Sequence, residues 1–270
     1  MLAPELPDGR IVLRIGSVPV GGVSDEWLAR LLEGPTPFAM RDGAIELVPR
    51  IDSFAGRSAA LAEWAEQSRD RWSLPGWRDE RMVIRDETDG QPIASIERAL
   101  LRPLGLLLHS VQACAYTVTA AGPLLWVARR SDAKPVDPNL LDALVAGGIS
   151  GFDDAASTLV RECAEEAGIP AELARRSSPA GMLELSYPTV YDGLAATHRE
   201  RVALNDLELP PHFVPEPTDG EHAAIEAMTP TEALASIEAG GWTRDGAQAT
   251  ADLILRKGWM PARTAVHRMR

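Results

Sequence analysis

The stretch GGISGFDDAASTLVRECAEEAGI, residues 147–169, decides how the rest of this chain is interpreted. Glycines form a turn at its start, and Asp153 or Asp154 can cap a helix that Gly168 ends in the left-handed conformation. Apolar residues recur within the helix at spacings of three and four, which is typical of one buried face. The residues of this face are Ala156, Val160, Cys163 and Ala167, widened by Ala155 and Leu159.

Carboxylates gather on one face of the same predicted helix. Glu162, Glu165 and Glu166 occupy positions i, i+3 and i+4, so their side chains are neighbours and repel one another. Arg161 can reach Glu165, but one arginine cannot balance three glutamates. A hard divalent cation takes oxygen ligands and is the natural counter-ion. The carbonyl of Gly147 can approach the same ion, because a glycine turn leaves room for it.

These residues resemble the Nudix box. That family has a glycine, five residues, a glutamate and seven residues, followed by Arg-Glu, two residues, Glu-Glu, one residue, Gly and an apolar residue. Asp153 stands where the family has the early glutamate. The alternative interpretation is an acidic surface helix with ordinary caps. It accounts for the glutamates but not for the spacing that matches the box. The positions in register are Gly147, Arg161, Glu162, Cys163, Glu165, Glu166, Gly168 and Ile169.

The resemblance implies hydrolysis of a diphosphate bond with Mg²⁺ or Mn²⁺ as the cofactor. Glu162, Glu165, Glu166 and Arg161 are then the catalytic residues, and the three glutamates with Gly147 are the metal ligands. Glu162 is also a candidate for the general base, because a carboxylate beside metal-bound water can accept its proton. Some members of the family take the base from a later loop, for which the candidates here are Glu200, Glu208 and Glu221.

The composition is that of a globular protein with an acidic surface. The 270 residues include 45% hydrophobic residues, 39 acidic and 27 basic side chains, and the formal net charge is −12. This charge disfavours nucleic acids and anionic membranes as partners. We find neither a signal-peptide pattern nor a membrane span, so we expect a cytoplasmic protein that binds a small-molecule diphosphate. The sequence leaves open whether the protein forms a homodimer. Cys114 and Cys163 are expected to be buried.

Hydrophobic patterns predict an α/β fold with two domains. Residues 1–104 form a smaller α+β domain that includes helices at 58–72 and from Ser95, with a strand at 77–84. Residues 105–270 form the Nudix domain, an α/β/α sandwich in which helices cover a mixed sheet. Its strands are predicted at 106–119, 124–129, 141–146, 181–185, 202–209 and 223–228, with a loop between Pro188 and Thr197, and its later helices at 229–238 and 245–257.

Further motifs narrow the resemblance. The first hundred residues resemble a domain of unknown function, DUF4743-like, that precedes the Nudix domain in plant chloroplast Nudix hydrolases and in the N-terminal halves of fungal thiamine pyrophosphokinases. This implies that damaged (oxo- or oxy-) thiamine diphosphates are cleaved to the monophosphate and phosphate. The motifs include Gly76-Trp77-Arg78-Asp79-Glu80, Glu97-Arg98-Ala99 and Asp219-Gly220-Glu221.

Two other functions stay open. Pro188 lies near where ADP-ribose hydrolases place a proline, which favours ADP-ribose or another nucleoside-diphosphate-linked substrate. The chain is alternatively a non-catalytic Nudix-like binding module. Arg129 and Arg130 end a predicted strand and are candidates for contact with a substrate phosphate.

Overall fold

The computed structural model describes residues 5–48, 51–134 and 136–260, which divide between two compact units. The first unit contains the chain up to His109 together with Ile149–Asp153 and Glu184–Arg201. The second contains Ser110–Gly148, Asp154–Leu183 and the chain from Val202. The domain boundary at residues 104 and 105 stays a prediction from the sequence.

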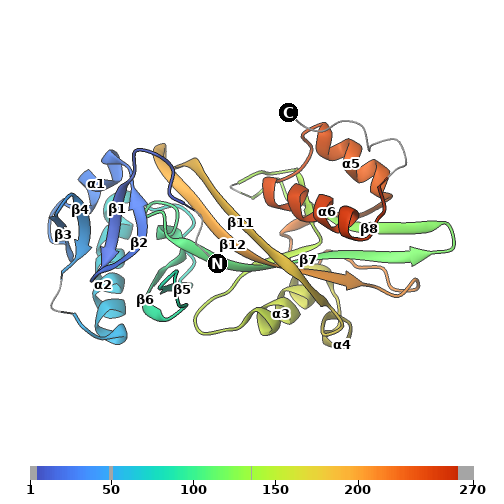
Figure 1. The fold of residues 1–270 in the computed structure, drawn as a ribbon, viewed down its shortest axis with the longest axis horizontal. Helices are drawn as coiled ribbons and strands as arrows, with labels where there is room; N and C mark the ends of the chain where they lie inside the picture. The colour runs from blue at the N-terminus through green and yellow to red at the C-terminus, as the bar shows by residue number, and fades with distance from the viewer. Residues whose placement is uncertain (1–4, 49–50, 135, 261–270) are drawn as a thin grey trace. The chain divides into compact units, whose positions relative to one another are not determined.

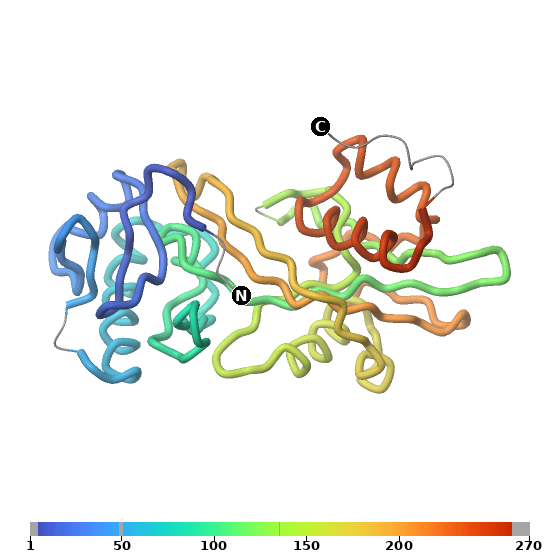
Figure 2. The backbone as a smooth tube through the Cα atoms, in the orientation of Figure 1, coloured from blue at the N-terminus to red at the C-terminus, as the bar shows by residue number. Residues whose placement is uncertain are grey.

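A four-stranded sheet and a long helix build the first part of the first unit. The sheet has the order β2-β1-β4-β3, in which β1 and β4 are parallel. Figure 2 shows helix α2 beside β6, against which it packs. The elements are β1 (Ile11–Ile15), β2 (Val18–Val23), α1 (Asp25–Leu31), β3 (Phe38–Arg41), β4 (Ala44–Leu47) and α2 (Phe54–Trp72).

Tryptophans form the centre of this unit's core. The ring of Trp72 lies edge-on to those of Trp27 and Trp64, with centroids 5.9 and 5.7 Å apart. Each of these side chains is at least nine-tenths buried, and such aromatic pairs add stability beyond the area they bury. The tryptophans of α1 and α2 are therefore structural anchors.

A two-stranded antiparallel sheet replaces a helix that the sequence predicted. Strands β5 (Arg81–Arg85) and β6 (Pro92–Glu97) pair with each other, and a single 3₁₀ turn follows at Arg98–Leu100. The helix expected from Ser95 is therefore wrong. Ile93, Ala94 and Ile96 are buried in the core, and the tertiary context overrides the local helical pattern.

Strands β11 (Ser178–Tyr191) and β12 (Leu194–Glu208) are much longer than the sequence predicted. The expected loop from Pro188 is wrong, because the strands continue to a tight turn at Asp192-Gly193. Both turn residues have positive φ, 52° and 72°, as in the type I′ turns that join hairpin strands. Pro188 is compatible with β11, because β11 is an edge strand and needs no second ladder there.

The main sheet has the order β11-β12-β7-β8-β13, with β10 paired to β7 and β9 to β8. An isolated parallel bridge joins Trp242 to Leu141, the first residue of β9. Figure 1 shows α3 and α4 on one side of the second unit's strands and α5 and α6 on the other. The predicted α/β/α arrangement is confirmed. The remaining elements are β7 (Leu107–Thr119), β8 (Gly122–Arg130), β9 (Leu141–Ala143), β10 (Val145–Gly148), α3 (Ala155–Ala167), α4 (Ala171–Ala174), β13 (His222–Met228), α5 (Pro230–Glu238) and α6 (Arg244–Arg256).

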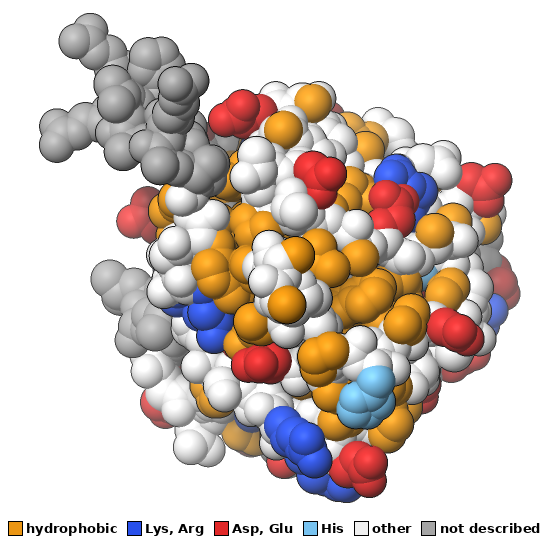
Figure 3. Space-filling model, turned by 90° about the vertical axis from the view of Figure 1, so that its right-hand side faces the viewer, with side chains coloured by type: hydrophobic (Ala, Val, Ile, Leu, Met, Phe, Trp, Pro, Cys, Tyr) orange, Lys and Arg blue, Asp and Glu red, His pale blue; other side chains and the backbone are white. Residues whose placement is uncertain are grey.

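Several features of the surface and interior bear on the expected partners. Within the described ranges, no helix has both the length and the apolar character needed to cross a bilayer. Cys114 and Cys163 are free and buried, as predicted. Figure 3 shows hydrophobic side chains gathered on the face that it draws. Val118, Val214 and Leu255 are exposed apolar residues of the second unit, and the homodimer stays a prediction.

Candidate metal and catalytic site

Helix α3 begins and ends where the sequence predicted. The side chain of Asp154 accepts the backbone N–H of Ser157 at 2.7 Å, and Gly168 ends the helix with φ of 61°. Its buried face contains Leu159, Cys163 and Ala167. Ala156 is exposed, contrary to the prediction, and a glutamate is buried instead.

That buried glutamate is Glu166. Only 4% of the residue is exposed, and its Oε2 accepts the backbone N–H of Ala146 at 2.9 Å. Burial raises its pKa well above the ordinary value for glutamate, the Ala146 N–H lowers it, and Glu162, Glu221 and Asp219 raise it further. A carboxylate held in this way needs a positive partner when it is ionised.

Glu162 lies against the glycine turn. A Cβ atom built on Gly147 would lie 2.2 Å from Glu162 Oε1, so only glycine leaves room for this carboxylate. Its Oε1 also lies 2.8 Å from Arg161 Nη2. Burial raises the pKa of Glu162, and Arg161 opposes that shift. A glycine is therefore required at position 147 to make room for the Glu162 side chain. This requirement does not depend on what the Gly147 carbonyl contacts.

We expect Gly147→Ala to lower kcat by about tenfold to a hundredfold, because the added methyl displaces the Glu162 carboxylate. The measurement is steady-state hydrolysis of a diphosphate, alone and in the Glu162→Ala background. Since a truncated Glu162 leaves space for the methyl group, Gly147→Ala should cost nothing further there. An equal loss in both backgrounds contradicts this role of Gly147.

Glu165 is exposed, in contrast to the buried Glu166. Its side chain is 53% exposed, and its Oε2 lies 2.8 Å from Arg161 Nη1. Arg161 thus bridges Glu162 and Glu165, which offsets part of the repulsion that the sequence indicated. The assignment of Glu165 as a metal ligand stays a prediction.

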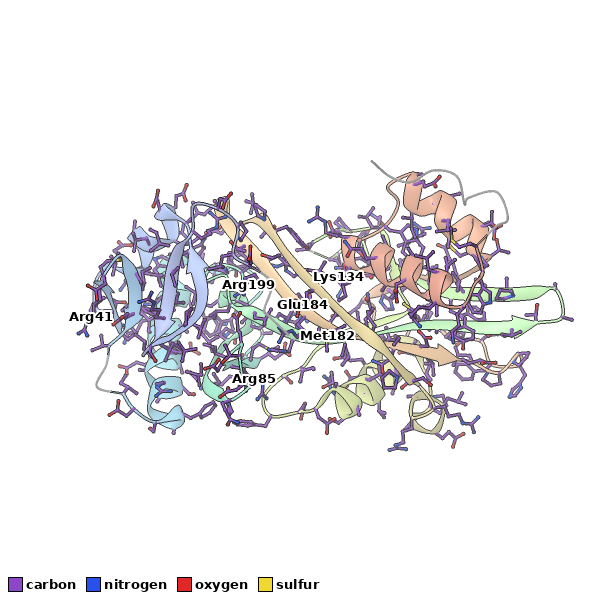
Figure 4. All side chains as sticks on the ribbon, in the orientation of Figure 1. Arg41, Arg85, Lys134, Met182, Glu184 and Arg199 are labelled. Carbon is purple, nitrogen blue, oxygen red and sulfur yellow. The ribbon has the colours of Figure 1, made fainter. Side chains whose placement is uncertain are left out.

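Two carboxylates from a distant loop join Glu166. One oxygen each from Glu166, Asp219 and Glu221 lies within 4.8 Å of the other two. Gly220 between them has φ of 78°, and Asp219 Oδ1 accepts the N–H of Glu221 at 2.8 Å. Lys134, labelled in Figure 4, forms an ion pair with Glu221. The three donors are all oxygens, as a hard divalent cation prefers.

The sequence pointed to part of this cluster. Glu221 was a candidate for a later-loop base, whereas Asp219 was noted only within the Asp-Gly-Glu motif. Two carboxylates separated by a glycine turn are a usable signal for a ligand pair. Their approach to Glu166 depends on β13, which pairs with β8 and begins directly after Glu221.

The other candidates for the general base have different partners. Glu208 Oε2 accepts the hydroxyl of Tyr116 at 3.3 Å. Glu200 belongs to the first unit, where its Oε2 lies 2.8 Å from His198 Nε2. Among the later-loop candidates, Glu221 is therefore the one that the structure brings to Glu166.

Arg129 and Arg130 both have structural partners. Arg129 Nε donates to Glu226 Oε1 at 2.6 Å. Arg130 Nη1 donates to Asp142 Oδ2 at 3.1 Å, and its other nitrogens donate to backbone carbonyls of residues 136 and 137. Burial and Asp245 raise the pKa of Asp142 to about 7, and Arg130 opposes that shift. Substrate contact by the two arginines stays a prediction.

Known families match the two parts of the chain. The model of the NUDIX domain matches residues 108–249, which is more than half of the chain. The model of a domain of unknown function, DUF4743, matches residues 10–107. The chain belongs to the NUDIX family, and the box resemblance is confirmed.

Plant proteins are among its relatives. The chain is 31% identical over 196 residues to Nudix hydrolase 20, chloroplastic, of Arabidopsis thaliana, covering 73% of this chain and 51% of the relative. It is 34% identical over 184 residues to Nudix hydrolase 24, chloroplastic, of the same plant, covering 68% and 49%. The chain thus spans about half the length of these relatives.

A solved structure of DR0079 from Deinococcus radiodurans resembles the chain with a TM-score of 0.49 and 23% sequence identity. The match covers 63% of this chain and 97% of that protein.

Proposed function

We propose that this protein hydrolyses a diphosphate bond with the help of Mg²⁺ or Mn²⁺. The observation that carries the proposal is the convergence of Glu166, Asp219 and Glu221 within 4.8 Å, with Glu166 almost fully buried. Membership of the NUDIX family supports it. The burial and mutual repulsion of these carboxylates argue against a purely structural role, because an ordinary acidic surface helix does not require a buried glutamate beside two further carboxylates.

The oxygen donors fit a divalent cation. Magnesium binds oxygens at about 2.1 Å, so ligand atoms on opposite sides of one ion lie roughly 4 Å apart. We propose Glu166, Asp219 and Glu221 as ligands, with Glu162 able to contribute a fourth carboxylate. A bound divalent cation would neutralise the diphosphate oxygens and acidify a water molecule.

The chain's own residues then have distinct roles. Glu162 accepts the proton of the attacking water, because burial raises its pKa toward the working pH. Arg161 orients Glu162 through their ion pair at 2.8 Å. The Ala146 N–H fixes the Glu166 carboxylate. Water attacks the terminal phosphorus, the bridging P–O bond breaks, and the products are phosphate and a monophosphate ester.

For the substrate, we propose damaged thiamine diphosphates of the oxo and oxy types. The support is the pairing of the DUF4743 match with the NUDIX domain and the similarity to the two plant proteins. ADP-ribose and dinucleotides are the competing substrates. The acidic charge of −12 gives no reason to propose nucleic acid as a partner.

A substrate panel with the full chain tests this function. Oxidised thiamine diphosphates, unmodified thiamine diphosphate, ADP-ribose and a dinucleotide are each incubated with Mg²⁺ or Mn²⁺, and phosphate and monophosphate products are quantified. We expect cation-dependent turnover with the highest kcat/KM for the oxidised forms, and no turnover with a chelator. A higher kcat/KM for ADP-ribose than for the oxidised thiamine diphosphates rejects the latter as the substrate. Binding without any hydrolysis rejects the enzyme in favour of a binding module.

A further inference from the structure

The last turn of α3 offers backbone carbonyls to the loop that carries Asp219 and Glu221. The last four carbonyls of a helix have no N–H partner within it. At this end of α3, the N–H groups of Gly168 and Ile169 both donate to the carbonyl of Cys163. The carbonyls that follow Cys163 can therefore accept hydrogen bonds from another segment.

That segment is the start of the loop. The Thr218 hydroxyl donates to the carbonyl oxygen of Glu165, and it also lies 3.4 Å from that of Ala164. The backbone N–H of Glu216 donates to the carbonyl of Ala167 at 3.3 Å. The start of the loop is thus fastened to the final turn of α3 by donors from two of its residues.

The other end of the loop is fastened to the segment that follows β8. The N–H of Ser131 donates to the carbonyl of Glu221 at 2.9 Å, and Lys134 forms an ion pair with the Glu221 carboxylate. Asp219 lies between these two attachments and directly follows Thr218 in the chain. The position of Asp219 relative to α3 therefore depends on Thr218.

This attachment holds the loop against electrostatic repulsion. Oxygens of Glu166, Asp219 and Glu221 lie within 4.8 Å of one another, and like charges at such distances repel. A single hydrogen bond from the exposed Thr218 contributes only modestly to the stability of the fold. It acts, however, on the residue next to a carboxylate that must be held near Glu166.

We propose that Thr218 is a positioning residue that sets the affinity of the carboxylate cluster for its divalent cation. The inference rests on the proposed function, because it requires Glu166, Asp219 and Glu221 to bind that cation. Without the Thr218 hydroxyl, repulsion favours loop positions in which Asp219 lies farther from Glu166. Cation binding must then restore the competent position, which lowers the apparent affinity.

The bound state should be less affected than the metal-free state. A bound cation attracts all three carboxylates and replaces their repulsion, so the assembled site needs the Thr218 bond less. The loss of kcat at saturating cation should therefore be smaller than the loss of affinity. A residue that only stabilised the fold would not produce this difference between affinity and kcat.

Mn²⁺ titration of the full chain, with free Mn²⁺ followed by electron paramagnetic resonance, tests the role of Thr218. Thr218→Val keeps the branched shape and removes the donor, so we expect the dissociation constant for Mn²⁺ to rise by about fivefold to tenfold. Thr218→Ser keeps the hydroxyl and should return the constant to within about twofold of wild type. Thr218 is exposed, so both variants should fold.

Thr119→Val is the matched control. The Thr119 hydroxyl donates to the carbonyl of Gly122 at 2.8 Å in the turn between β7 and β8. The substitution removes the same kind of bond from a turn that carries none of the three carboxylates. It should leave the affinity for Mn²⁺ unchanged.

The outcomes separate this inference from the proposed function. Weaker Mn²⁺ binding by Thr218→Val, with rescue by Thr218→Ser and a smaller loss of kcat at saturating Mn²⁺, supports the positioning role. Unchanged affinity in Thr218→Val, or an equal loss in Thr119→Val, overturns the inference and leaves the proposed function standing. Wild-type protein that does not bind Mn²⁺ overturns both. Mn²⁺ binding without hydrolysis of any diphosphate rejects the proposed activity alone.

Discussion

Glu166→Gln is expected to lower kcat by about a thousandfold or more, because it removes a charged ligand from the cation that stabilises the transition state. The amide keeps the shape of the side chain, so the fold should be retained. Hydrolysis of the best diphosphate in the panel, at saturating Mg²⁺, is the measurement. A variant with wild-type turnover contradicts the role of Glu166.

The same substitution should stabilise the metal-free protein at neutral pH. Burial raises the pKa of Glu166, so the folded state keeps this proton over a pH range in which the unfolded chain has lost it. This group's contribution to stability is therefore fully present below its unfolded pKa and is lost as pH rises through its folded pKa. Thermal unfolding with a chelator at pH 5 and pH 8 should show a smaller difference for the variant than for the wild type.

Glu221→Gln is expected to lower kcat by about a hundredfold, whereas Glu165→Gln should lower it by less than about tenfold. Glu221 lies in the carboxylate cluster with Glu166. Glu165 is half exposed and paired with Arg161, and exposed ion pairs contribute little. Each variant removes one negative charge, so a difference in kcat between them reflects the position of the glutamate rather than the loss of a charge.

Mg²⁺ titrations complete this comparison. The concentration of Mg²⁺ that gives half-maximal activity should rise more for Glu221→Gln than for Glu165→Gln. The reverse order would show that the three glutamates of the box, rather than the loop at residues 219–221, hold the ion.

The sequence predicted those parts of the site whose signals are local. Asp154 and Gly168 cap α3 through contacts within a few residues, and the box register depends on spacing alone. Gly147 was predicted as a ligand through its carbonyl, and the structure adds a second reason for it, the approach of Glu162. The ligand role itself is still untested.

What the sequence missed depends on distant contacts. Asp219 approaches Glu166 because β13 pairs with β8, and a pattern within one helix cannot contain that pairing. The helix predicted from Ser95 became a strand because a partner strand was available for it. The burial of Glu166 could not be predicted from a periodicity that counts only apolar residues, because a carboxylate stands at one of the buried positions of the helix.

The central claim is that Glu166, Asp219 and Glu221 hold a divalent cation against a diphosphate. A crystal of the full chain with Mn²⁺ and a non-hydrolysable diphosphate analogue tests it most directly, because anomalous scattering locates the manganese. The account predicts a manganese peak bonded to oxygens of these three side chains and to the analogue. An ordered analogue with no manganese at these carboxylates, or manganese bound elsewhere, would contradict it.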